Sequence, residues 1–363
     1  MYLTQIQTSS KMYPLFLGKS IIPQLPLVIR QVKPNVSKIM IITDQQVNVM
    51  YGMKLTSLLS KSFSICKYVM PKGEKSKNFM EFYKCLTFAL EQKLDRQSLI
   101  IALGGGVVGD LAGFVAASYM RGISWIQVPT TLLAHDSAVG GKVAINHPLG
   151  KNLIGAFYQP DAVLYDIDFL YTLPKKELKS GFAELIKHAL ISKDSFYEWL
   201  KNNVCSIDDL KEDTLAYAIR KGIEIKASII KEDEKENDIR TYLNFGHTLG
   251  HAIEAEKGYG EISHGEAVVI GMVFALRIGR EMQISDINID ELEQWLTYLG
   301  YNTRICPSLS SNRLIERMKQ DKKNKSNQIH MVILKNVGSP MMMNVDESII
   351  STVLKASSQI VER

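Results

Sequence analysis

The 363-residue sequence predicts an α/β N-terminal domain followed by an all-α C-terminal domain. The first observation behind this prediction is the apolar run Ser98 to Leu103, which is typical of a strand buried on both faces and leads directly into the three glycines Gly104–Gly106. The second is that helical periodicity takes over beyond Leu173-Pro174. We therefore expect one domain over residues 1–174 and another over residues 175–363.

Composition and charge indicate a globular protein that does not bind nucleic acid. Hydrophobic residues make up 46% of the chain and charged residues 22%, and the net charge of +5 comes without a dense Lys/Arg run. The four cysteines stand singly, which favours reduced thiols and a cytoplasmic location. We find no basic-then-apolar signal sequence, and the longest apolar stretch, Ala267 to Leu276, is too short for a bilayer.

The first elements of the α/β domain are two strands. Tyr2 to Thr8 alternates apolar and polar residues, as in a strand with one solvated face, and Lys38 to Thr43 is typical of a buried strand. Asp44 stands at the carboxyl end of the second strand, where open α/β sheets bind ligands. Asp44 could bind a ribose hydroxyl or cap a turn or helix, and the sequence leaves both interpretations open.

A polar loop, Pro71 to Lys77, precedes a predicted helix over Asn78 to Gln92. Within it, Glu74 could bind another ribose and Lys77 a phosphate, because their charges suit these groups. A solvated loop is the alternative.

The glycine-rich turn after the strand predicts a phosphate site. Gly104, Gly106 and Gly109 fit G-x-G-x-x-G, and Asp110 opens a helix predicted over Leu111 to Tyr119. The acidic residue expected about 20 positions later is absent, so we interpret the turn as phosphate-binding rather than as an ordinary dinucleotide fingerprint.

A long polar stretch between the predicted strands Ile123–Val128 and Ala162–Tyr165 lacks any clear periodicity. Its interleaved apolar residues argue against disorder, and we interpret it as a functional loop rather than a solvated one. We take its polar side chains as candidates for a functional role, and we add Arg121, which precedes the first of the two strands. The candidates are Arg121, Thr130, Thr131, His135, Asp136, Lys142, Asn146, His147, Lys151 and Asn152.

The second half is predicted to be mostly helical, with one short strand. Helices are expected over Lys175–Ile191, Asp194–Asn202, Leu210–Glu232, Leu243–Lys257, His264–Met282, Asp290–Leu299, Ser311–Lys319 and Asp346–Ser357, and a strand over Gln328–Leu334.

Three histidines in this half, together with Glu184, predict a metal site. His247 and His251 lie four residues apart and share a helix face, and His264 begins another helix. Two histidines and a carboxylate are a common catalytic zinc set. Several combinations are possible, because Thr248 stands where an H-E-x-x-H motif has its glutamate, and a single histidine usually has a structural role.

The helical half also carries cations: Lys187, Lys226, Arg240, Lys322 and Lys323. The two adjacent lysines could equally be surface residues after a helix.

The chain resembles the 3-dehydroquinate synthase family of sugar-phosphate cyclases. The resemblance spans nearly the whole chain, and its phrases are highly specific in combination: GGGVVGDLAGF, VGGK, NHPLGKN, GAFYQP, GFAELIKH, NFGHTLGHAIE and SHGEAV. It implies a Rossmann-like NAD-binding domain and a helical domain. It further implies a lyase of the shikimate pathway, which supplies aromatic amino acid biosynthesis. The implied reaction converts 3-deoxy-D-arabino-heptulosonate 7-phosphate to 3-dehydroquinate and phosphate by transient oxidation with NAD, β-elimination, reduction and intramolecular aldol closure.

The resemblance also implies roles for individual residues. The metal, zinc or alternatively cobalt, would be bound by Glu184, His247 and His264, with His251 facing the substrate. NAD would contact Asp44, Glu74, Lys77, Gly105, Gly106, Val107, Asp110, Thr130, Thr131, Lys142, Lys151, Phe169, Thr172, Leu173 and Glu177. The substrate would contact Arg121, Asp136, Lys142, Asn152, Lys187, Lys226, Arg240, Asn244, His251 and Lys323.

One stretch departs from the family pattern. Many members have one more residue before the loop aspartate, where this chain has Ala134-His135-Asp136-Ser137. Asp136 keeps its assignment as a substrate contact. The missing residue changes the backbone directly before Asp136, and the resemblance implies no role for His135.

The resemblance implies a homodimer that acts on a small phosphorylated keto acid and recycles its NAD. Three alternatives are another sugar-phosphate cyclase, a metal- and NAD-dependent polyol dehydrogenase, and a nucleotide-binding regulator without catalytic activity. Arg240 and Lys226 suit a substrate with a carboxylate, which favours the first interpretation.

Overall fold

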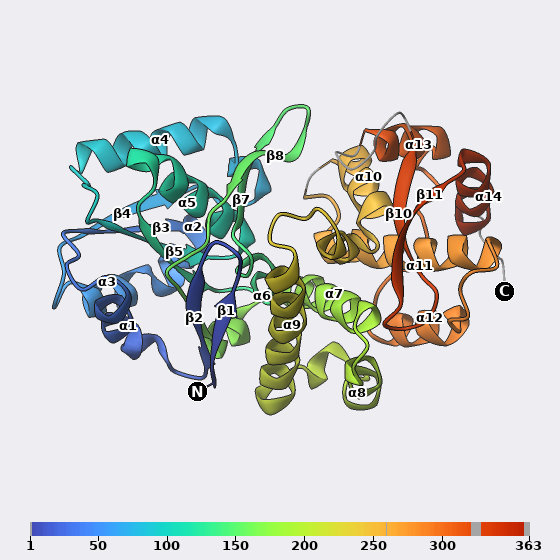
Figure 1. Ribbon diagram of the computed structural model, residues 1–363, viewed down its shortest axis with the longest axis horizontal. Helices are drawn as coiled ribbons and strands as arrows, with labels where there is room; N and C mark the ends of the chain where they lie inside the picture. The colour runs from blue at the N-terminus through green and yellow to red at the C-terminus, as the bar shows by residue number, and fades with distance from the viewer. Residues whose placement is uncertain (1, 259, 321–327, 359–363) are drawn as a thin grey trace. The chain divides into compact units, whose positions relative to one another are not determined.

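The computed structural model describes residues 2–258, 260–320 and 328–358. The chain forms two compact units (Figure 1). The first comprises Met1–Leu173 and Ile230–Lys235, and the second comprises Pro174–Ile229 and Glu236–Arg363. The sequence placed all residues after 174 in the second domain, whereas the structure places Ile230–Lys235 with the first unit.

The first unit is built on a seven-stranded sheet in the order β1-β2-β9-β6-β5-β3-β4. Only the β1–β2 pair is antiparallel among these described strands. The strands are β1 (Tyr2–Gln7), β2 (Met12–Gly18), β3 (Ile39–Asp44), β4 (Ile65–Met70), β5 (Leu99–Gly104), β6 (Ser124–Pro129) and β9 (Ala162–Asp166). β2 and β4 were not predicted from the sequence.

Helices cover both faces of this sheet, as Figure 1 shows. Met40 and Ile42 of β3 pack with α4 (Phe79–Glu91) and α5 (Gly106–Ser118). Ile39 and Ile41 of the same strand pack with α1 (Leu25–Val32) and α3 (Met53–Leu59). Because successive side chains of a strand point to opposite faces, this continuous apolar run is required by a sheet buried on both sides. The predicted α/β domain is confirmed.

The order of the strands places a topological switch point between β3 and β5. From β3 the chain goes on to the edge strand β4, and it then returns to β5 on the other side of β3. Helices that leave neighbouring strands toward opposite faces open a crevice at the carboxyl ends, where nucleotides bind in open α/β sheets. Asp44 and the glycine turn stand at these two strand ends.

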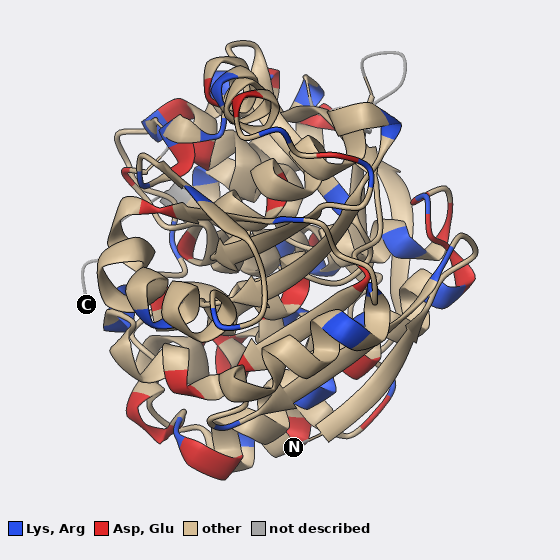
Figure 2. Cartoon of the chain, turned by 90° about the vertical axis from the view of Figure 1, so that its left-hand side faces the viewer, with Lys and Arg blue, Asp and Glu red and all other residues tan. Residues whose placement is uncertain are grey.

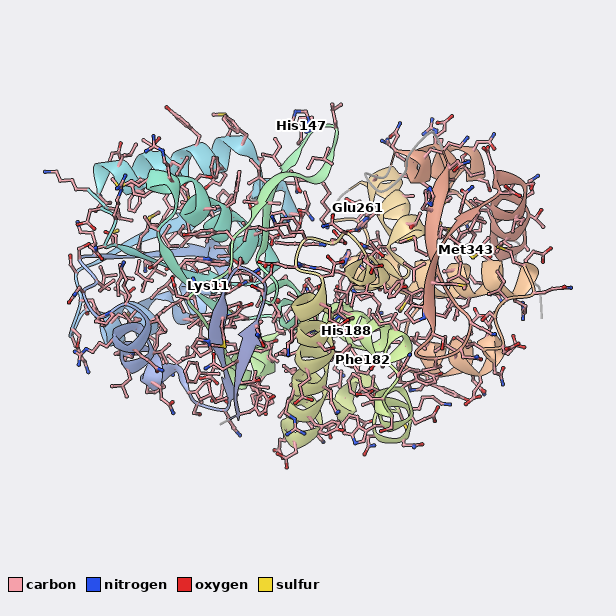
Figure 3. The ribbon with its side chains drawn as sticks, in the orientation of Figure 1. Lys11, His147, Phe182, His188, Glu261 and Met343 are labelled. Carbon is pink, nitrogen blue, oxygen red and sulfur yellow. The ribbon has the colours of Figure 1, made fainter. Side chains whose placement is uncertain are left out.

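The predicted long loop is wrong over much of its length, because it forms a short helix and a hairpin. The helix is α6 (Ala134–Ser137), and the hairpin pairs β7 (Lys142–His147) with β8 (Gly150–Phe157). Val143 and Ile145 are buried against the α4–α5 side of the sheet, whereas His147 lies at the projecting end of the hairpin (Figure 3). Only two side chains of β7 are buried, a pattern too short to be recognised as periodic.

The described part of the second unit is helical with one hairpin. Its helices are α7 (Lys175–Ile191), α8 (Phe196–Asn203), α9 (Glu212–Glu232, which continues into the first unit's segment), α10 (His247–Lys257), α11 (His264–Glu281), α12 (Ile289–Tyr298), α13 (Ser311–Lys319) and α14 (Glu347–Ser358). The helical C-terminal domain is thus confirmed. The predicted strand pairs, as β10 (Ile329–Leu334), with β11 (Pro340–Val345), which was not predicted.

Two helix starts differ from the prediction by four residues or more. α5 begins at Gly106, five residues earlier than expected, because glycines lower helix propensity without preventing a helix that packs well. α10 begins at His247 rather than Leu243, because Gly246 has a left-handed backbone with φ of 79°.

α10 and α11 cross with their backbones in contact. A Cβ atom on Gly271 would lie 1.8 Å from the carbonyl oxygen of Gly246, and one on Gly250 would lie 3.1 Å from that of Ala267. This approach brings the start of α10 beside α11, so that His247 and His264 come together in three dimensions.

Glu234 fastens the returning segment Ile230–Lys235 within the first unit. Its carboxylate accepts hydrogen bonds from the backbone N–H of Ser10 at 2.8 Å, from Gln159 Nε2 at 2.7 Å, and from the hydroxyls of Ser9 and Ser10. Burial alone would raise the pKa of Glu234, but the hydrogen bonds from Ser10, Ser9 and Gln159 outweigh it and lower the pKa to about 2.

We expect Glu234→Gln to destabilise the first unit by about 2 kcal/mol at pH 7. The folded pKa lies below the unfolded one, so this stability is present above about pH 4.5 and is lost as the pH falls toward 2. The difference in the free energy of unfolding between wild type and Glu234→Gln should narrow by about 2 kcal/mol as the pH falls from 5 to 3. The measurement is urea unfolding followed by Trp125 fluorescence, with Trp199 and Trp295 replaced by phenylalanine.

The matched control for this experiment is Glu232→Gln, two residues away and exposed. Its stability should follow wild type at every pH. A Glu234→Gln protein as stable as the control at pH 7 would contradict the assignment.

Basic and acidic residues are interspersed over the face that Figure 2 presents, in keeping with the mild net charge. Among the described residues, no helix combines the length and the apolar character that crossing a bilayer requires.

Candidate functional site

The carboxyl edge of β5 offers an anion site at the start of α5. The N-cap of this 13-residue helix is Gly105, which has no side chain to cap it. The N–H groups of the first turn are therefore available to bind an anion. Side chains at these glycines would collide: a Cβ on Gly104 would lie 2.5 Å from Val108, and one on Gly105 would lie 2.8 Å from Thr131. Glycine is therefore required at these two positions because a side chain would not fit, and not because the backbone has a positive φ.

Asp44 lies at the carboxyl end of β3, one strand over from this turn. Its side chain accepts hydrogen bonds from the N–H groups of Gln46 at 2.8 Å and Val47 at 2.9 Å, at the start of α2 (Gln45–Val47). The structure therefore shows the capping role that the sequence left open, at the position where a ribose would approach in a fold of this type.

Lys77 is the centre of a buried charge network in the first unit. Its Nζ lies 2.8 Å from Asp110 Oδ2 and 3.2 Å from Glu74 Oε1. Burial alone would lower the pKa of Lys77, but the carboxylates of Asp110 and Glu74 raise it above its ordinary value. Asn146 donates to Glu74 at 2.8 Å, and Lys151 Nζ lies 4.0 Å from the same carboxylate. Four predicted cofactor residues are thus brought together, and Lys77 is bound to carboxylates within the protein.

The remaining cofactor candidates of the first unit lie around the same strand ends. Thr130 donates its N–H to Gly104 at 3.0 Å, and Thr131 accepts a hydrogen bond from Tyr165 at 2.7 Å. Phe169 and Thr172 lie in the 3-10 helix η5 (Ile167–Thr172), where both contact Tyr51. The other placements are Gly106 and Val107 in the first turn of α5, Leu173 directly after η5, and Glu177 in the first turn of α7, in the second unit.

The predicted substrate residues of the first unit occupy irregular backbone. Arg121 and Asn152 have positive φ angles of 68° and 56°, which is uncommon outside glycine. Asn152 also donates its N–H to Asn146 at 2.9 Å. Asp136 lies in α6, and Lys142 is the first residue of β7. His135 is buried, with Nδ1 2.7 Å from the carbonyl oxygen of Leu132, which gives it a structural role.

In the second unit, three helices bring a carboxylate and two imidazoles together. α7, marked by Phe182 and His188 in Figure 3, carries the buried Glu184. Its Oε1 lies 3.5 Å from His247 Nε2 and 3.3 Å from His264 Nε2. The three ligand atoms lie within 4.8 Å of one another, and this donor set suits zinc or cobalt.

The orientation of the two imidazoles supports this set. His247 Nδ1 lies 3.1 Å from the carbonyl oxygen of Phe245, and His264 Nδ1 lies 3.1 Å from Glu254 Oε2. With Nδ1 donating to these acceptors, each Nε2 presents a lone pair toward Glu184. Burial, followed by the ammonium of Lys187, holds the pKa of His247 well below its ordinary range, so that its ring is neutral, as a metal ligand requires.

The structure also groups His251, Glu254 and His264 within 4.8 Å, a second combination that includes a carboxylate the sequence did not single out. The ring centroids of His251 and His247 are 5.2 Å apart. His251 thus adjoins the metal set from the same face of α10.

Buried cations accompany the metal set in the second unit. Lys187, Lys226 and Arg240 are 1%, 6% and 0% exposed. Because fully buried cations are rare, three of them in one unit favour a functional role with an anion. Lys187 pairs with Glu184, and Arg240 lies in the 3-10 helix η7 (Ile239–Asn244). Lys323 lies outside the described residues.

Sequence reasoning missed two acidic residues that hold the candidates in place, and it named Asn146 as a polar candidate without a partner. Glu236 accepts a hydrogen bond from Asn244 at 2.7 Å, Glu254 contacts His264, and Asn146 bridges Glu74 and the backbone of Asn152. Glu254 could have been found, since it lies three residues after His251 and seven after His247, on one helix face. The contact of Glu236 with Asn244 left no signal in the spacing, and neither did the partners of Asn146.

The chain matches two family models and is similar to curated relatives along its length. Residues 67–180 match the model described as 3-dehydroquinate synthase N-terminal, and residues 181–324 match 3-dehydroquinate synthase C-terminal. The 3-dehydroquinate synthase of Bacillus cytotoxicus is 52% identical over 351 residues, covering 97% of this chain and 95% of that protein. That of Geobacillus thermodenitrificans is 51% identical over 344 residues, covering 94% of each.

Solved structures with a similar fold include sugar-phosphate cyclases and a dehydrogenase. A 2-deoxy-scyllo-inosose synthase complexed with carbaglucose-6-phosphate, NAD⁺ and Co²⁺ has a TM-score of 0.89 and 25% identity, over 98% of this chain and all of that one. The 2-epi-5-epi-valiolone synthase of Streptomyces hygroscopicus, with NAD⁺ and Zn²⁺, has a TM-score of 0.86 and 21% identity over 95% and 96%. A probable glycerol dehydrogenase from Sinorhizobium meliloti reaches a TM-score of 0.67 at 14% identity over 94% and 95%.

Proposed function

The chain belongs to the 3-dehydroquinate synthase family, and from this premise we propose that it converts 3-deoxy-arabino-heptulosonate 7-phosphate to 3-dehydroquinate and phosphate. The observation that carries the proposal is the set of Glu184, His247 and His264, which stands in one unit with three buried cations. Relatives about 50% identical over nearly their full length support the same reaction.

We propose NAD and a divalent metal, zinc or cobalt, as the cofactors. The cyclase with 25% identity was solved with NAD⁺ and Co²⁺, and this chain has a nitrogen and oxygen donor set that fits either metal. When bound, NAD supplies a reversible hydride acceptor and the metal supplies a Lewis acid. Glu184, His247 and His264 would hold the metal, and Asp44, the turn at Gly105 and the network around Lys77 would hold NAD.

The chain's own side chains would bind and orient the two anionic ends of the substrate. In the second unit, the buried Lys226 and Arg240 suit the carboxylate, because a desolvated cation recognises an anion strongly. Arg121, Lys142 and Asn152 of the first unit suit the phosphate, together with His251 and Lys323. After phosphate has left, holding the carboxylate in one orientation favours the intramolecular ring closure.

Asn244 and Lys187 would position the reacting part of the substrate. The carboxylate of Glu236 fixes the amide of Asn244, and Glu184 pairs with Lys187, so both polar groups are oriented within the protein. Asp136 completes the proposed substrate contacts.

The fold similarity to a glycerol dehydrogenase makes a polyol dehydrogenase the second candidate. A dehydrogenase would accumulate NADH and would have no use for cations directed at a phosphate and a carboxylate. Another sugar-phosphate cyclase would not need the carboxylate site that we assign to Lys226 and Arg240.

The test measures phosphate release from 3-deoxy-arabino-heptulosonate 7-phosphate with catalytic NAD, before and after removal of metal by a chelator. We expect release that depends on metal and NAD, without accumulation of NADH absorbance. A sugar phosphate that lacks the carboxylate is the control substrate and should react at least about 100-fold more slowly. Steady NADH formation from a polyol, or equal rates on both phosphates, would overturn the proposal.

We further propose that the native metal is zinc and that the enzyme is a cytoplasmic homodimer. Family membership supports these assignments. Sedimentation at assay concentration measures the assembly, and a fully active monomer would exclude the dimer.

A further inference from the structure

Glu254 is a buried carboxylate that has no place in the proposed set of metal ligands. It lies on α10 and is 5% exposed. Burying a carboxylate costs free energy unless hydrogen bonds or charges compensate it. Its Oε2 lies 3.1 Å from Nδ1 of His264, which is the first residue of the neighbouring helix α11.

The two nitrogens of His264 therefore face two different carboxylates. Nδ1 faces Glu254 and Nε2 faces Glu184, at 3.1 and 3.3 Å. A carboxylate oxygen can only accept, so Nδ1 must carry a hydrogen toward Glu254. The lone pair of a neutral ring is then on Nε2 and points at Glu184, where a cation between the two ligand atoms would relieve their repulsion.

His247 provides an internal comparison. Its Nδ1 faces a neutral acceptor, the carbonyl oxygen of Phe245, whereas Nδ1 of His264 faces a charged one. A carboxylate behind an imidazole fixes the ring's tautomer and orientation and increases its basicity as a ligand. The Nδ1 atoms of the two histidines thus have acceptors of unequal strength, and the stronger acceptor, a carboxylate, belongs to His264.

We propose that Glu254 is the positioning residue for His264 and strengthens metal binding at the Glu184–His247–His264 set without binding the metal itself. The proposal rests on the metal site of the proposed function and deepens it. Glu254 acts through Nδ1 of His264, so its loss weakens binding but leaves three ligands in place.

The test compares metal affinity among apoprotein variants, independently of turnover. The measurement is the Zn²⁺ dissociation constant in competition with a chromophoric chelator, together with the visible spectrum of Co²⁺ bound to the same proteins. We expect Glu254→Ala to bind zinc about 10- to 100-fold more weakly than wild type, with a Co²⁺ spectrum that keeps the wild-type ligand set. Glu254→Gln, which keeps the shape and an acceptor but loses the charge, should show a smaller loss.

The matched control is Glu256→Gln on the same helix. Glu256 pairs with Arg313 at 2.9 Å and with Arg317, so its replacement removes the same charge near the site without touching His264. Its zinc affinity should stay within about twofold of wild type, because the Glu256 carboxylate is paired with two arginines and does not contact His264.

Three results would overturn the proposal. Wild-type zinc affinity in both Glu254 variants would show that the contact does not act on the metal. A loss as large as that of Glu184→Ala, with a changed Co²⁺ spectrum, would make Glu254 a ligand. An equal loss of zinc affinity in Glu256→Gln would show that the effect comes from removing a negative charge near the site and not from the contact with His264. If Glu254→Ala does not fold by circular dichroism, the isosteric Glu254→Gln decides. Wild-type protein that binds no zinc would instead refute the proposed metal site.

Discussion

Glu184→Ala is expected to abolish tight zinc binding and to lower phosphate release at least about 1000-fold. The carboxylate is the group toward which both histidine Nε2 atoms converge, at 3.5 and 3.3 Å. Its removal leaves two nitrogens, a set too small for a stable zinc site in a protein. The check is the zinc content after dialysis, measured by atomic absorption beside the phosphate assay.

Lys187 makes a second variant necessary. It is 1% exposed and pairs with Glu184, so alanine at position 184 removes the partner of a buried ammonium, a change that costs about 3 to 5 kcal/mol in folding. Glu184→Gln keeps the side chain's shape and an acceptor for Lys187 while removing the anionic ligand. The control is Glu281→Ala at the exposed end of α11. Stoichiometric zinc retained in either Glu184 variant would refute the ligand assignment.

Gly271→Ala is expected to destabilise the second unit by about 3 kcal/mol or more. The added methyl group would lie 1.8 Å from the carbonyl oxygen of Gly246, and no rotamer can relieve a collision between Cβ and backbone. α10 and α11 must then separate, which also moves His247 away from His264. We therefore expect weaker zinc binding to accompany the lower stability, although Gly271 is not a ligand.

The measurement is urea unfolding followed by Trp199 and Trp295 fluorescence in a Trp125→Phe background. Gly250→Ala is the graded comparison, because its Cβ would lie 3.1 Å from the nearest backbone atom, a distance that a small shift can accommodate. Its stability should fall less. Unchanged unfolding midpoints in Gly271→Ala would show that the helices are not held at this spacing.

Elements with strong internal patterns could be predicted from the sequence. α7 and α13 begin and end at the predicted residues, because each follows a helix-start signal and keeps its period to the end. β3 and β5 were found as uninterrupted apolar runs, which a strand covered on both faces requires. β2, β4 and the β7–β8 hairpin were missed because their burial is partial or lacks a simple alternation.

The candidate site was predictable to the extent that its residues share a helix or a motif. His247 and His251 lie one turn apart, and the glycine turn directly follows a recognisable strand. Spacing by itself left several metal combinations open, and the resemblance to a known family selected one of them. The structure places that set within 4.8 Å and also shows a second group, His251, Glu254 and His264, that the sequence did not predict.

The sequence by itself determined an α/β half followed by a helical half, the chemical types at the site and the family, because these depend on local periodicity and on motifs. Only the tertiary structure decided which groups face one another: Glu254 with His264, Glu234 with Ser10, and Gly271 with Gly246. Glu234 and Ser10 are 224 residues apart. A periodic pattern reports that a face is buried, but the partner that covers it comes from a distant part of the chain and leaves no local trace.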